Sequence, residues 1–597
     1  MRNYYFVILI LIILSVLSCS EKSPNSKHKK STYCNPLDLN YRFSIEPLAY
    51  KQYSWGAIMP GCDMDKGEYH SFREAADPTV VEFNDEYYLF ASKSGGYWVS
   101  VDLMNWEFIT TPDLPLEEYA PTAVKIGNSL YFATSFSEWI FKTDNPRSGK
   151  WEIANLSNPL PAKEWPQNFQ DLCLFLDDDQ KLYLYYGCIR PTLAVELDYK
   201  NGFKPIGKLD EVLAPGARYA WNHIDTIKNR NMMVEGPWVN KYNGKYYLQY
   251  ATFSDSYVDA VCVSSNPLKG FKVADSNPFS QKARGFVTGT GHGSTLMDRN
   301  NNYWHFTCVH SPTIKHNFER RLAMFPSGFD KDGMLFCNTS FGDYPHYIPT
   351  KETKDPESLF TGWVLLSYNK KVETSSSMDE YPASNAVDEN FHTYWSASSA
   401  SKEEWFSIDL EKKCNVYAIQ INFAEHLAKV KGRTGKGFQY LVEYSNDKVE
   451  WSILIDKTNS NDDFPHDYTE LETPTLARYI RISRVGMPDG MFAMYDFRVF
   501  GKNDEITTPE AVSNLTIDRD NEDGKIVNLT WNKVSDAIGY NIRYGIAKDK
   551  LYMSRIIYSD TTLKITDLNR EMKYYFTIDV FNEGGVTRGE IISETDI

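Results

Sequence analysis

Hydrophobic and polar residues alternate along this chain in short runs that are separated by turns. Alternation over about four to eight residues predicts half-buried β-strands. No long segment shows the helical period, in which apolar residues recur every three to four positions. The chain is therefore predicted to be all-β.

One pattern recurs five times within residues 40–350: a polar turn followed by an aromatic-rich strand. The equivalent aromatic residues are Tyr88, Tyr131, Tyr183, Tyr247 and Trp304, so the spacings are 43, 52, 64 and 57 residues. Each spacing suits a four-stranded blade with loops of variable length. The repeat predicts a five-bladed β-propeller over residues 40–350.

Ionisable residues precede four of the five repeated aromatics by nearly the same distance. Asp77 lies 11 residues before its aromatic, whereas Asp171, Glu235 and His292 each lie 12 residues before theirs. The first strand of each blade lines the central channel of a propeller. These four side chains are therefore predicted to converge on one axis.

Three carboxylates at one axis favour glycoside hydrolysis, which needs a carboxylic acid for the leaving oxygen and a carboxylate as base or nucleophile. Asp77 is the predicted base that activates water, and Glu235 is the predicted acid. Asp171 is predicted to raise the pKa of Glu235 and to orient it. Carboxylates on separate blades leave room for a water between them, which indicates inversion at a separation of about 6.5–9.5 Å.

Four short motifs surround these residues: Asp-Pro at Asp77, Leu-Phe-Leu-Asp-Asp-Asp at residues 174–179 after Asp171, Glu-Gly-Pro at Glu235, and Gly-His-Gly-Ser at His292. Together they resemble glycoside hydrolase family 43. That resemblance implies five blades, inversion and the three carboxylate roles given above. Members mostly remove terminal α-L-arabinofuranosyl or β-D-xylosyl units, and some act on galactosyl or galactofuranosyl units. The second repeat departs from the family pattern at residues 119–122, so the sugar stays open.

Several further side chains are candidates for binding substrate. Arg320 either reaches substrate hydroxyls or pairs with acidic neighbours, and His292 either holds a central cation or water or hydrogen-bonds within the core. Aromatic rings that stack on sugars can equally pack between strands. The aromatic candidates are Trp98, Phe136, Trp139 and Trp238.

Residues 365–502 form a separate pattern of short alternating strands. They resemble the discoidin or F5/8 type C domain, a jelly roll that bacterial hydrolases use as a carbohydrate-binding module. By this resemblance Asp388, Thr393 and Asp496 help to hold a structural Ca²⁺, although Asp496 stands where a Glu is more usual. Whether this domain binds sugar stays open.

Residues 508–597 resemble a fibronectin type III β-sandwich. Leu-Thr-Trp at residues 529–531 fits the core of its second strand, and Tyr574 fits a tyrosine corner. Such a domain is expected to act as a spacer.

The amino terminus has the pattern of an export signal. A positive start precedes an apolar run over residues 6–17, which is too short to cross a bilayer comfortably. The run ends in Val-Leu-Ser-Cys at Cys19, which resembles a lipoprotein processing box. We expect a signal peptide over residues 1–19, a tether over residues 20–39, and an exported protein whose lipidated Cys19 anchors it to the outer membrane. A plain signal peptide with an incidental cysteine is the alternative.

The charge composition excludes some classes of binding partner. The net charge of −16 and the isoelectric point near 5.3 argue against nucleic acid and anionic membrane surfaces, which require positive charge. A neutral polysaccharide or oligosaccharide is the expected partner of a monomer that meets the membrane only through its lipid. The other cysteines lack zinc-ligand spacing and are expected to be buried thiols. A disulfide between Cys34 and Cys62 stays open.

The sequence thus predicts an inverting, exo-acting enzyme, similar to an α-L-arabinofuranosidase or a β-D-xylosidase, that acts on plant-type polysaccharide. The alternatives are a galactosidase or galactofuranosidase of the same family, and a non-catalytic surface propeller that binds glycans. The presence of all three carboxylates favours an enzyme. Structural Ca²⁺ is the one cofactor considered, at the propeller axis, in the discoidin-like domain, or in both.

Overall fold

The computed structural model describes residues 30–47, 69–116, 119–189, 191–213, 234–310, 319–590 and 592–595. Within these residues the chain consists of β-strands and short 3-10 turns, without an α-helix. The all-β prediction is therefore confirmed. No helix of the described chain is long and apolar enough to cross a membrane. The predicted signal peptide, Cys19 and Cys62 lie outside the described residues.

Five four-stranded antiparallel sheets follow one another along the chain, and each keeps its strands in sequence order. We call them together the five-sheet domain. Their strands are, sheet by sheet, β4 (Ala76–Phe83), β5 (Glu86–Ser92), β6 (Gly96–Ser100) and β7 (Glu107–Thr110); β8 (Thr122–Ile126), β9 (Ser129–Ala133), β10 (Phe141–Thr143) and β11 (Glu152–Ile153); β12 (Leu172–Leu176), β13 (Leu182–Tyr186), β14 (Thr192–Asp198) and β15 (Lys204–Leu213); β16 (Glu235–Tyr242), β17 (Lys245–Phe253), β18 (Tyr257–Ser264) and β19 (Lys272–Val273); β20 (Thr288–Met297), β21 (Tyr303–His310), β22 (Arg320–Phe329) and β23 (Leu335–Cys337).

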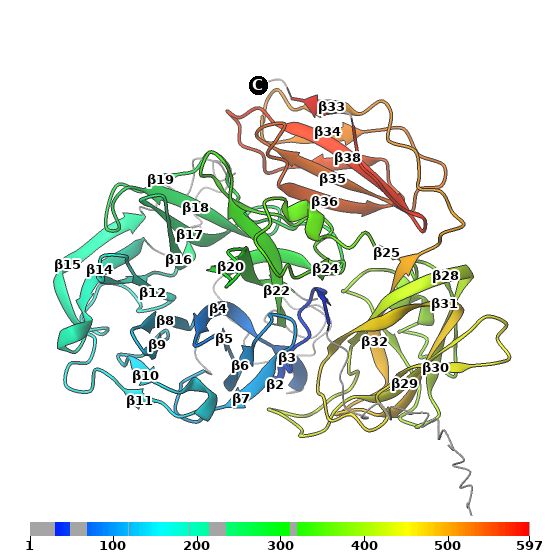
Figure 1. Ribbon diagram of the computed structural model, residues 1–597, viewed down its shortest axis with the longest axis horizontal. Helices are drawn as coiled ribbons and strands as arrows, with labels where there is room; N and C mark the ends of the chain where they lie inside the picture. Colours follow the sequence, from blue (N-terminus) through cyan, green and yellow to red (C-terminus); the bar gives the residue numbers. More distant parts are fainter. Residues whose placement is uncertain are drawn as a thin grey trace, which may run out of the picture.

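The first strands of the five sheets form a closed circle. Strand β4 contacts β8, β8 contacts β12, β12 contacts β16, β16 contacts β20, and β20 contacts β4. Figure 1 shows the sheets arranged around a common centre in the left half of the molecule. Residues near the start of each first strand therefore approach one another from five directions.

A left-handed backbone conformation recurs at the start of each first strand. The φ angle is 53° at Asp77, 52° at Ala120, 54° at Asp171, 61° at Gly236 and 55° at His292. The strand register also shifts near Asp77, Gly236 and His292. Such bulges change the direction in which side chains point, and a positive φ is costly for residues other than glycine. The five sheets thus share one unusual turn at the centre.

A second β-region follows as one eight-stranded sheet system at the right of Figure 1. Its long strands pair Trp405–Ser483 through Asn422–His466 in antiparallel register. Buried apolar residues between the strands form its core. Its strands are β25 (Val364–Leu365), β26 (Lys371–Thr374), β27 (Trp395–Ser396), β28 (Trp405–Phe423), β29 (Gln439–Ser445), β30 (Ser452–Asp456), β31 (His466–Gly486) and β32 (Ala493–Lys502).

A third β-region has a three-stranded and a five-stranded antiparallel sheet. Trp531 is buried in the core between them, and the hydroxyl of Tyr574 accepts a hydrogen bond of 3.1 Å from the Asn569 N–H. The strands are β33 (Thr516–Arg519), β34 (Val527–Thr530) and β37 (Thr562–Ile565); β35 (Gly539–Gly545), β36 (Met553–Tyr558), β38 (Tyr575–Asn582), β39 (Gly585–Thr587) and β40 (Ser593–Glu594).

The prediction of a tether over residues 20–39 is wrong for its described part, residues 30–39. Strand β1 (Thr32–Tyr33) pairs with β24 (His346–Tyr347), and Tyr33, Leu37 and Leu39 are buried in the apolar core of the five-sheet domain. The chain then continues into the hairpin of β2 (Arg42–Pro47) and β3 (Tyr69–Glu74). Segments that bury apolar side chains in a core are ordered parts of the fold.

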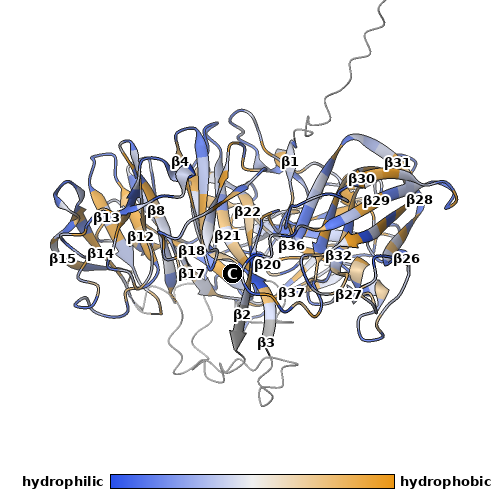
Figure 2. Cartoon of the chain, turned by 90° about the horizontal axis from the view of Figure 1, so that it is seen from below, coloured by the Kyte–Doolittle hydropathy of each residue, from blue (hydrophilic) through white to orange (hydrophobic). Residues whose placement is uncertain are grey.

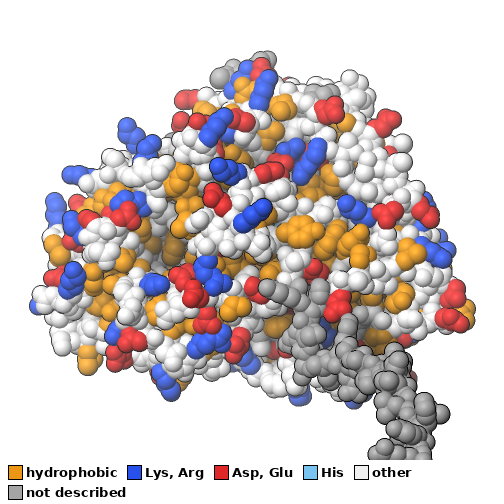
Figure 3. All heavy atoms as spheres, in the orientation of Figure 1, with side chains coloured by type: hydrophobic (Ala, Val, Ile, Leu, Met, Phe, Trp, Pro, Cys, Tyr) orange, Lys and Arg blue, Asp and Glu red, His pale blue; other side chains and the backbone are white. Residues whose placement is uncertain are grey.

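The three regions pack against one another. Tyr344 and Tyr558 share a hydrogen bond of 2.6 Å between the five-sheet and third regions, and one apolar core contains Phe341, Phe500 and Phe581 from all three parts. Figure 2 shows hydrophobic residues along strands of the five-sheet domain at the left and of the second region at the right. On the face shown in Figure 3, basic and acidic side chains are interspersed.

Candidate active site

The carboxylate of Asp77, on β4, is held by three side chains. Its Oδ2 accepts a hydrogen bond of 2.7 Å from the Ser92 hydroxyl. Its Oδ1 lies 3.2 Å from Nη1 of Arg320 and 3.3 Å from Nδ1 of His292. These contacts orient the carboxylate and place cationic groups beside it.

Arg320, on β22, also forms a bond of 3.1 Å from Nη2 to Oε1 of Glu74. Its guanidinium is nearly buried. Burial raises the pKa of Glu74 to about 7, even though Arg320 lowers it. Of the two predicted roles of Arg320, the structure therefore supports the pairing with acidic neighbours.

Glu235 is the first residue of β16, and its carboxyl group is buried. Its Oε1 accepts a hydrogen bond from the Tyr257 hydroxyl. Its Oε2 accepts one from the Cys188 thiol at 3.4 Å. Burial is the largest cause that raises the pKa of Glu235, and the charge of Asp77 also raises it. A carboxyl group in such surroundings holds its proton to a higher pH than an exposed carboxyl group does.

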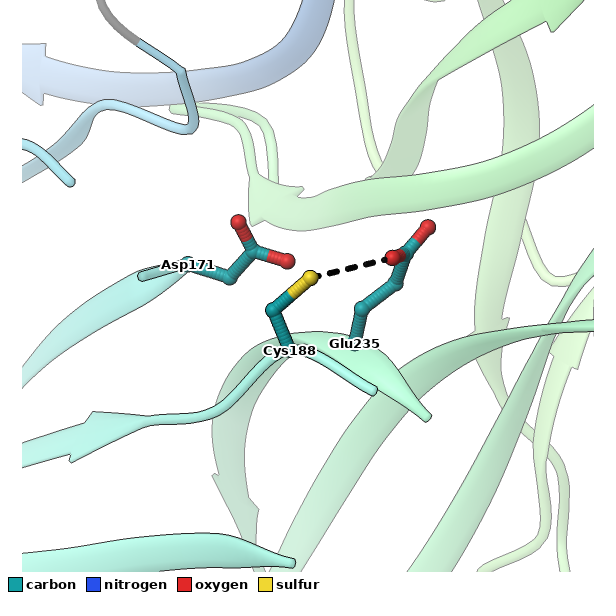
Figure 4. Close-up of side chains that lie close together, drawn as sticks. All are labelled: Asp171, Cys188 and Glu235. Atoms are coloured by element: carbon teal, nitrogen blue, oxygen red, sulfur yellow. Dashed lines mark hydrogen bonds between the residues drawn. The ribbon is translucent and has the colours of Figure 1, made fainter. Parts of the chain in front are cut away.

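Asp171 immediately precedes β12 and lies beside Glu235. Burial, followed by the charges of Glu235 and Asp77, raises the pKa of Asp171 to about 7. Its Oδ2 accepts a hydrogen bond of 3.2 Å from the Gly236 N–H, and its own N–H donates to the Ser135 hydroxyl at 2.9 Å. Figure 4 shows Asp171 and Glu235 on either side of Cys188.

His292, on β20, lies against the same carboxylates. Burial alone lowers the pKa of its imidazole, but Asp77, Asp171 and Glu235 outweigh burial, so that the net pKa is raised. A Cβ on Gly236 would lie 2.5 Å from the His292 ring, so only glycine fits there. The contact with Asp77 gives His292 an orienting role in this structure, and the predicted cation at the axis stays a prediction.

The aromatic candidates differ in their exposure. The prediction that Trp98 contacts sugar is wrong, because its side chain is 0% exposed and packs against Tyr41 and Phe108 inside the fold. Trp139 and Trp238 are half-buried and pack against apolar cores. Phe136 is 53% exposed and follows Ser135, the residue that binds Asp171. It is the candidate ring best placed to meet a ligand.

The sequence prediction missed Ser92, Cys188 and Tyr257 as members of the site. Ser92 ends β5, Cys188 lies two residues after β13, and Tyr257 begins β18. Since β4 and β5 are antiparallel and pair Ala76 with Ser92, the end of each second strand lies beside the start of the first. Counting forward from the repeated aromatics, as well as backward, would have found Ser92 and Cys188.

The predicted calcium ligands of the second region lie in a separate cluster. The hydroxyl of Thr393 donates to Oδ2 of Asp388 at 2.7 Å, and the Glu389 N–H donates to Oδ2 of Asp496 at 2.8 Å. Oδ1 of Asp496 is buried without a hydrogen-bond partner among the described residues. Burial raises the pKa of Asp388 to about 6 and that of Asp496 well above its usual range. Oxygen ligands with an unsatisfied buried atom fit a hard cation such as Ca²⁺.

Two family models match the chain. Residues 72–335 match the model of glycosyl hydrolases family 43, and residues 371–495 match the F5/8 type C domain. The chain carries a family 43 glycoside hydrolase domain. The first model covers all five sheets up to the start of β23 and includes Asp77, Asp171 and Glu235, and the second covers most of the second β-region. The protein is thus a glycoside hydrolase with an appended F5/8 type C domain.

Solved structures resemble this glycoside hydrolase at low sequence identity. One described as a glycoside hydrolase is 18% identical, covers 71% of this chain and 97% of its own, and has a TM-score of 0.43. An exo-1,5-α-L-arabinanase from a bovine ruminal metagenomic library is 18% identical, with coverages of 45% and 97% and a TM-score of 0.34. A β-xylosidase is 17% identical, with coverages of 44% and 94% and a TM-score of 0.34. A search of curated proteins gives no match.

Proposed function

We propose that the five-sheet domain is a five-bladed β-propeller that hydrolyses terminal glycosidic bonds with inversion. Asp77 acts as the general base, Glu235 acts as the general acid, and Asp171 tunes the pKa of Glu235 and orients it. We expect the enzyme to remove terminal α-L-arabinofuranosyl or β-D-xylosyl units from plant-type polysaccharide and to release them as free sugars. Galactosyl and galactofuranosyl units are the alternatives.

The contrast between Asp77 and Glu235 carries this proposal. Asp77 lies beside the cationic Arg320 and contacts an imidazole, whereas the side chains that donate hydrogen bonds to Glu235 among the described residues are neutral, the Tyr257 hydroxyl and the Cys188 thiol. Two carboxyl groups whose surroundings favour opposite protonation states are what acid–base hydrolysis requires.

In the proposed step, Asp77 removes a proton from a water while the water oxygen bonds to the anomeric carbon. The bond from that carbon to the leaving oxygen breaks, and Glu235 gives its proton to the leaving oxygen. Asp171 stays close to Glu235 and disfavours its ionisation before the step. The exposed ring of Phe136 supports the sugar from the side of Ser135.

The remaining parts receive supporting roles in this proposal. The third region is a fibronectin type III domain, because it pairs two sheets over Trp531 and has a tyrosine corner at Tyr574. Asp388, Thr393 and Asp496 would hold a structural Ca²⁺ in the F5/8 type C domain. The lipoprotein motif at Cys19 supports export and lipid anchoring, and we expect the protein to be a monomer.

The test compares the native enzyme with the variants Asp77→Ala and Glu235→Ala on aryl arabinofuranosides, xylosides and galactofuranosides. We expect the native protein to release monosaccharide from at least one of them, and both variants to lose that activity. Nuclear magnetic resonance of the first-formed product should show the inverted anomer. A retained anomer would exclude the roles given to Asp77 and water.

A glycan-binding protein without catalysis is the rival function, because the F5/8 type C domain suits adhesion. Binding without turnover by the native protein, unchanged in both variants, would favour this rival. The two buried carboxyl groups of Asp171 and Glu235 argue against it, because a binding surface has no need of raised pKa values.

A further inference from the structure

The thiol of Cys188 has no part in the proposed acid–base step, although it lies between two carboxyl groups of the site. One ligand atom from each of Asp171, Cys188 and Glu235 lies within 4.8 Å of the other two. Cys188 Sγ lies 3.4 Å from Oε2 of Glu235. Figure 4 shows the thiol directed between the two carboxyl groups.

The backbone on both sides of Cys188 fixes this arrangement. The Gly187 N–H donates to the carbonyl of Gln170, the residue before Asp171, at 2.9 Å. The Ile189 N–H donates to the carbonyl of Val234, the residue before Glu235, at 3.0 Å. The chain around Cys188 is therefore bonded to the chain around each carboxyl group, and the three side chains are held together before any ligand arrives.

We propose that Asp171, Cys188 and Glu235 form an inhibitory binding site for a thiophilic divalent cation such as Zn²⁺. Zinc accepts sulfur and carboxylate ligands at about 2.3 Å and 2.0–2.2 Å in a tetrahedron. Two such ligands lie about 3.6 Å apart, close to the 3.4 Å between Cys188 Sγ and Glu235 Oε2. Three protein ligands leave the fourth coordination position for water. A small movement of the Asp171 carboxyl group toward Cys188 and Glu235 would bring the third ligand to bonding distance.

The ligand chemistry selects the ion. A thiolate binds Zn²⁺ much better than the hard cations Mg²⁺ and Ca²⁺, which prefer oxygen alone. Binding replaces the proton of the Cys188 thiol, which leaves to solvent, together with any proton on the two carboxyl groups. The ion then binds the Glu235 carboxyl group, which in the proposed mechanism must give its proton to the leaving oxygen. This consequence for activity rests on the proposed function, whereas the binding itself does not.

The first experiment measures binding without catalysis. Full-length protein that has been stripped of metal is titrated with Co²⁺, which reports a thiolate ligand by a near-ultraviolet charge-transfer band, and then with Zn²⁺, which should remove that band. Calorimetry in buffers of different ionisation enthalpy should show proton release. The absence of the cobalt band in the native protein would overturn the proposal.

The variant Cys188→Ser keeps the size of the side chain and removes the soft ligand. Loss of a group that merely supports a ligand costs about 10–100-fold in metal affinity, so loss of the thiolate itself should weaken Zn²⁺ binding by at least as much. Cys414→Ser is the matched control, since Cys414 is a buried thiol of the F5/8 type C domain and should leave binding unchanged. Equal affinity in native protein and Cys188→Ser would overturn the proposal.

The second experiment measures inhibition on whichever glycoside the native enzyme cleaves. Zn²⁺ should inhibit reversibly, with full recovery after a chelator is added, and Mg²⁺ should not inhibit. The inhibition constant of Cys188→Ser, compared with its own uninhibited rate, should rise in step with the loss of affinity. If no glycoside is cleaved, the proposed function fails while the cobalt titration still decides the binding site. Inhibition that is equal in native enzyme and Cys188→Ser would overturn the inhibitory role.

Discussion

Two regions of this protein bury carboxyl groups, with opposite consequences. Where the hairpin of β2 and β3 meets the F5/8 type C domain, Arg73 binds both Glu425 and Asp463, whose oxygens lie 2.6 Å and 2.5 Å from its Nη2. At the centre of the five sheets, the neighbours that act on Asp171 are His292, Glu235 and Asp77, two of them carboxylates.

The difference lies in the partner rather than in the burial. A buried carboxylate with a well-placed guanidinium stays charged and holds two surfaces together. A buried carboxyl group next to other carboxyl groups holds its proton up to a higher pH. The interface has the first arrangement, which favours cohesion, and the candidate active site has the second, which suits the proposed acid–base chemistry.

Replacement of the predicted acid should have the largest effect. We expect Glu235→Gln to lower kcat by about 10²–10⁴-fold, the usual contribution of a general acid. The loss should be smaller for a substrate with an activated aryl leaving group, which needs little protonation. Stopped assays on a matched pair of aryl glycosides measure the contrast. An equal loss on both substrates would speak against the acid role of Glu235.

Removal of the interface cation should have the next largest effect. In Arg73→Met, Glu425 and Asp463 stay buried but lose their cationic partner. The free energy of unfolding should therefore fall by about 3–5 kcal/mol. The control is Arg481→Met, because Arg481 forms a more exposed pair with Glu443 and should cost at most about 1 kcal/mol. Urea unfolding measures both. Equal losses would mean that burial does not decide the strength of these pairs.

The raised pKa of Asp171 should appear in the pH dependence of stability. Its pKa rises from 3.8 to about 7 on folding, so the folded state binds more protons than the unfolded state between these values. The stability that Asp171 contributes is therefore complete below about pH 4 and is lost as the pH rises to about 7. We expect Asp171→Asn to flatten this decline in thermal unfolding between pH 4 and pH 8, whereas Asp85→Asn, at an exposed turn, should not. A decline of unchanged slope in Asp171→Asn would contradict the pKa shift.

The smallest effect should come from a neutral donor. The Tyr257 hydroxyl bonds to Glu235 and lowers the pKa of that carboxyl group. Tyr257→Phe should therefore raise the pKa of Glu235 and move the alkaline limb of the pH–rate profile upward by about one unit. The pH dependence of kcat/KM measures the shift. A downward movement would show that Tyr257 does not act on the acid.

Several features of the site could be predicted from sequence because covalent spacing carries them. Asp77, Asp171 and His292 precede the repeated aromatics at a nearly constant distance, and all three share the positive φ at the start of a first strand. A repeated structural unit puts equivalent residues in equivalent places. Counting along the chain therefore found them without any knowledge of contacts.

Other features depended on contacts between distant segments. Trp98 has the pattern of a strand aromatic, and only the tertiary packing, which places Tyr41 and Phe108 against it, decides that its side chain is fully buried. Residues 30–39 looked like a tether because their polar neighbours hid Tyr33 and Leu39, which a strand about 300 residues away helps to bury.

The sequence by itself determined the all-β character of this glycoside hydrolase and the carboxyl residues that lead its first strands, since both follow from local periodicity. Tertiary structure alone decided that Asp77 lies beside a guanidinium, that Glu235 contacts a thiol, and that Asp171 is buried next to other carboxyl groups. Charge and protonation depend on neighbours within a few ångströms. In this chain Arg320 begins β22 and Cys188 follows β13 by two residues, and only the folded chain brings them beside Asp77 and Glu235.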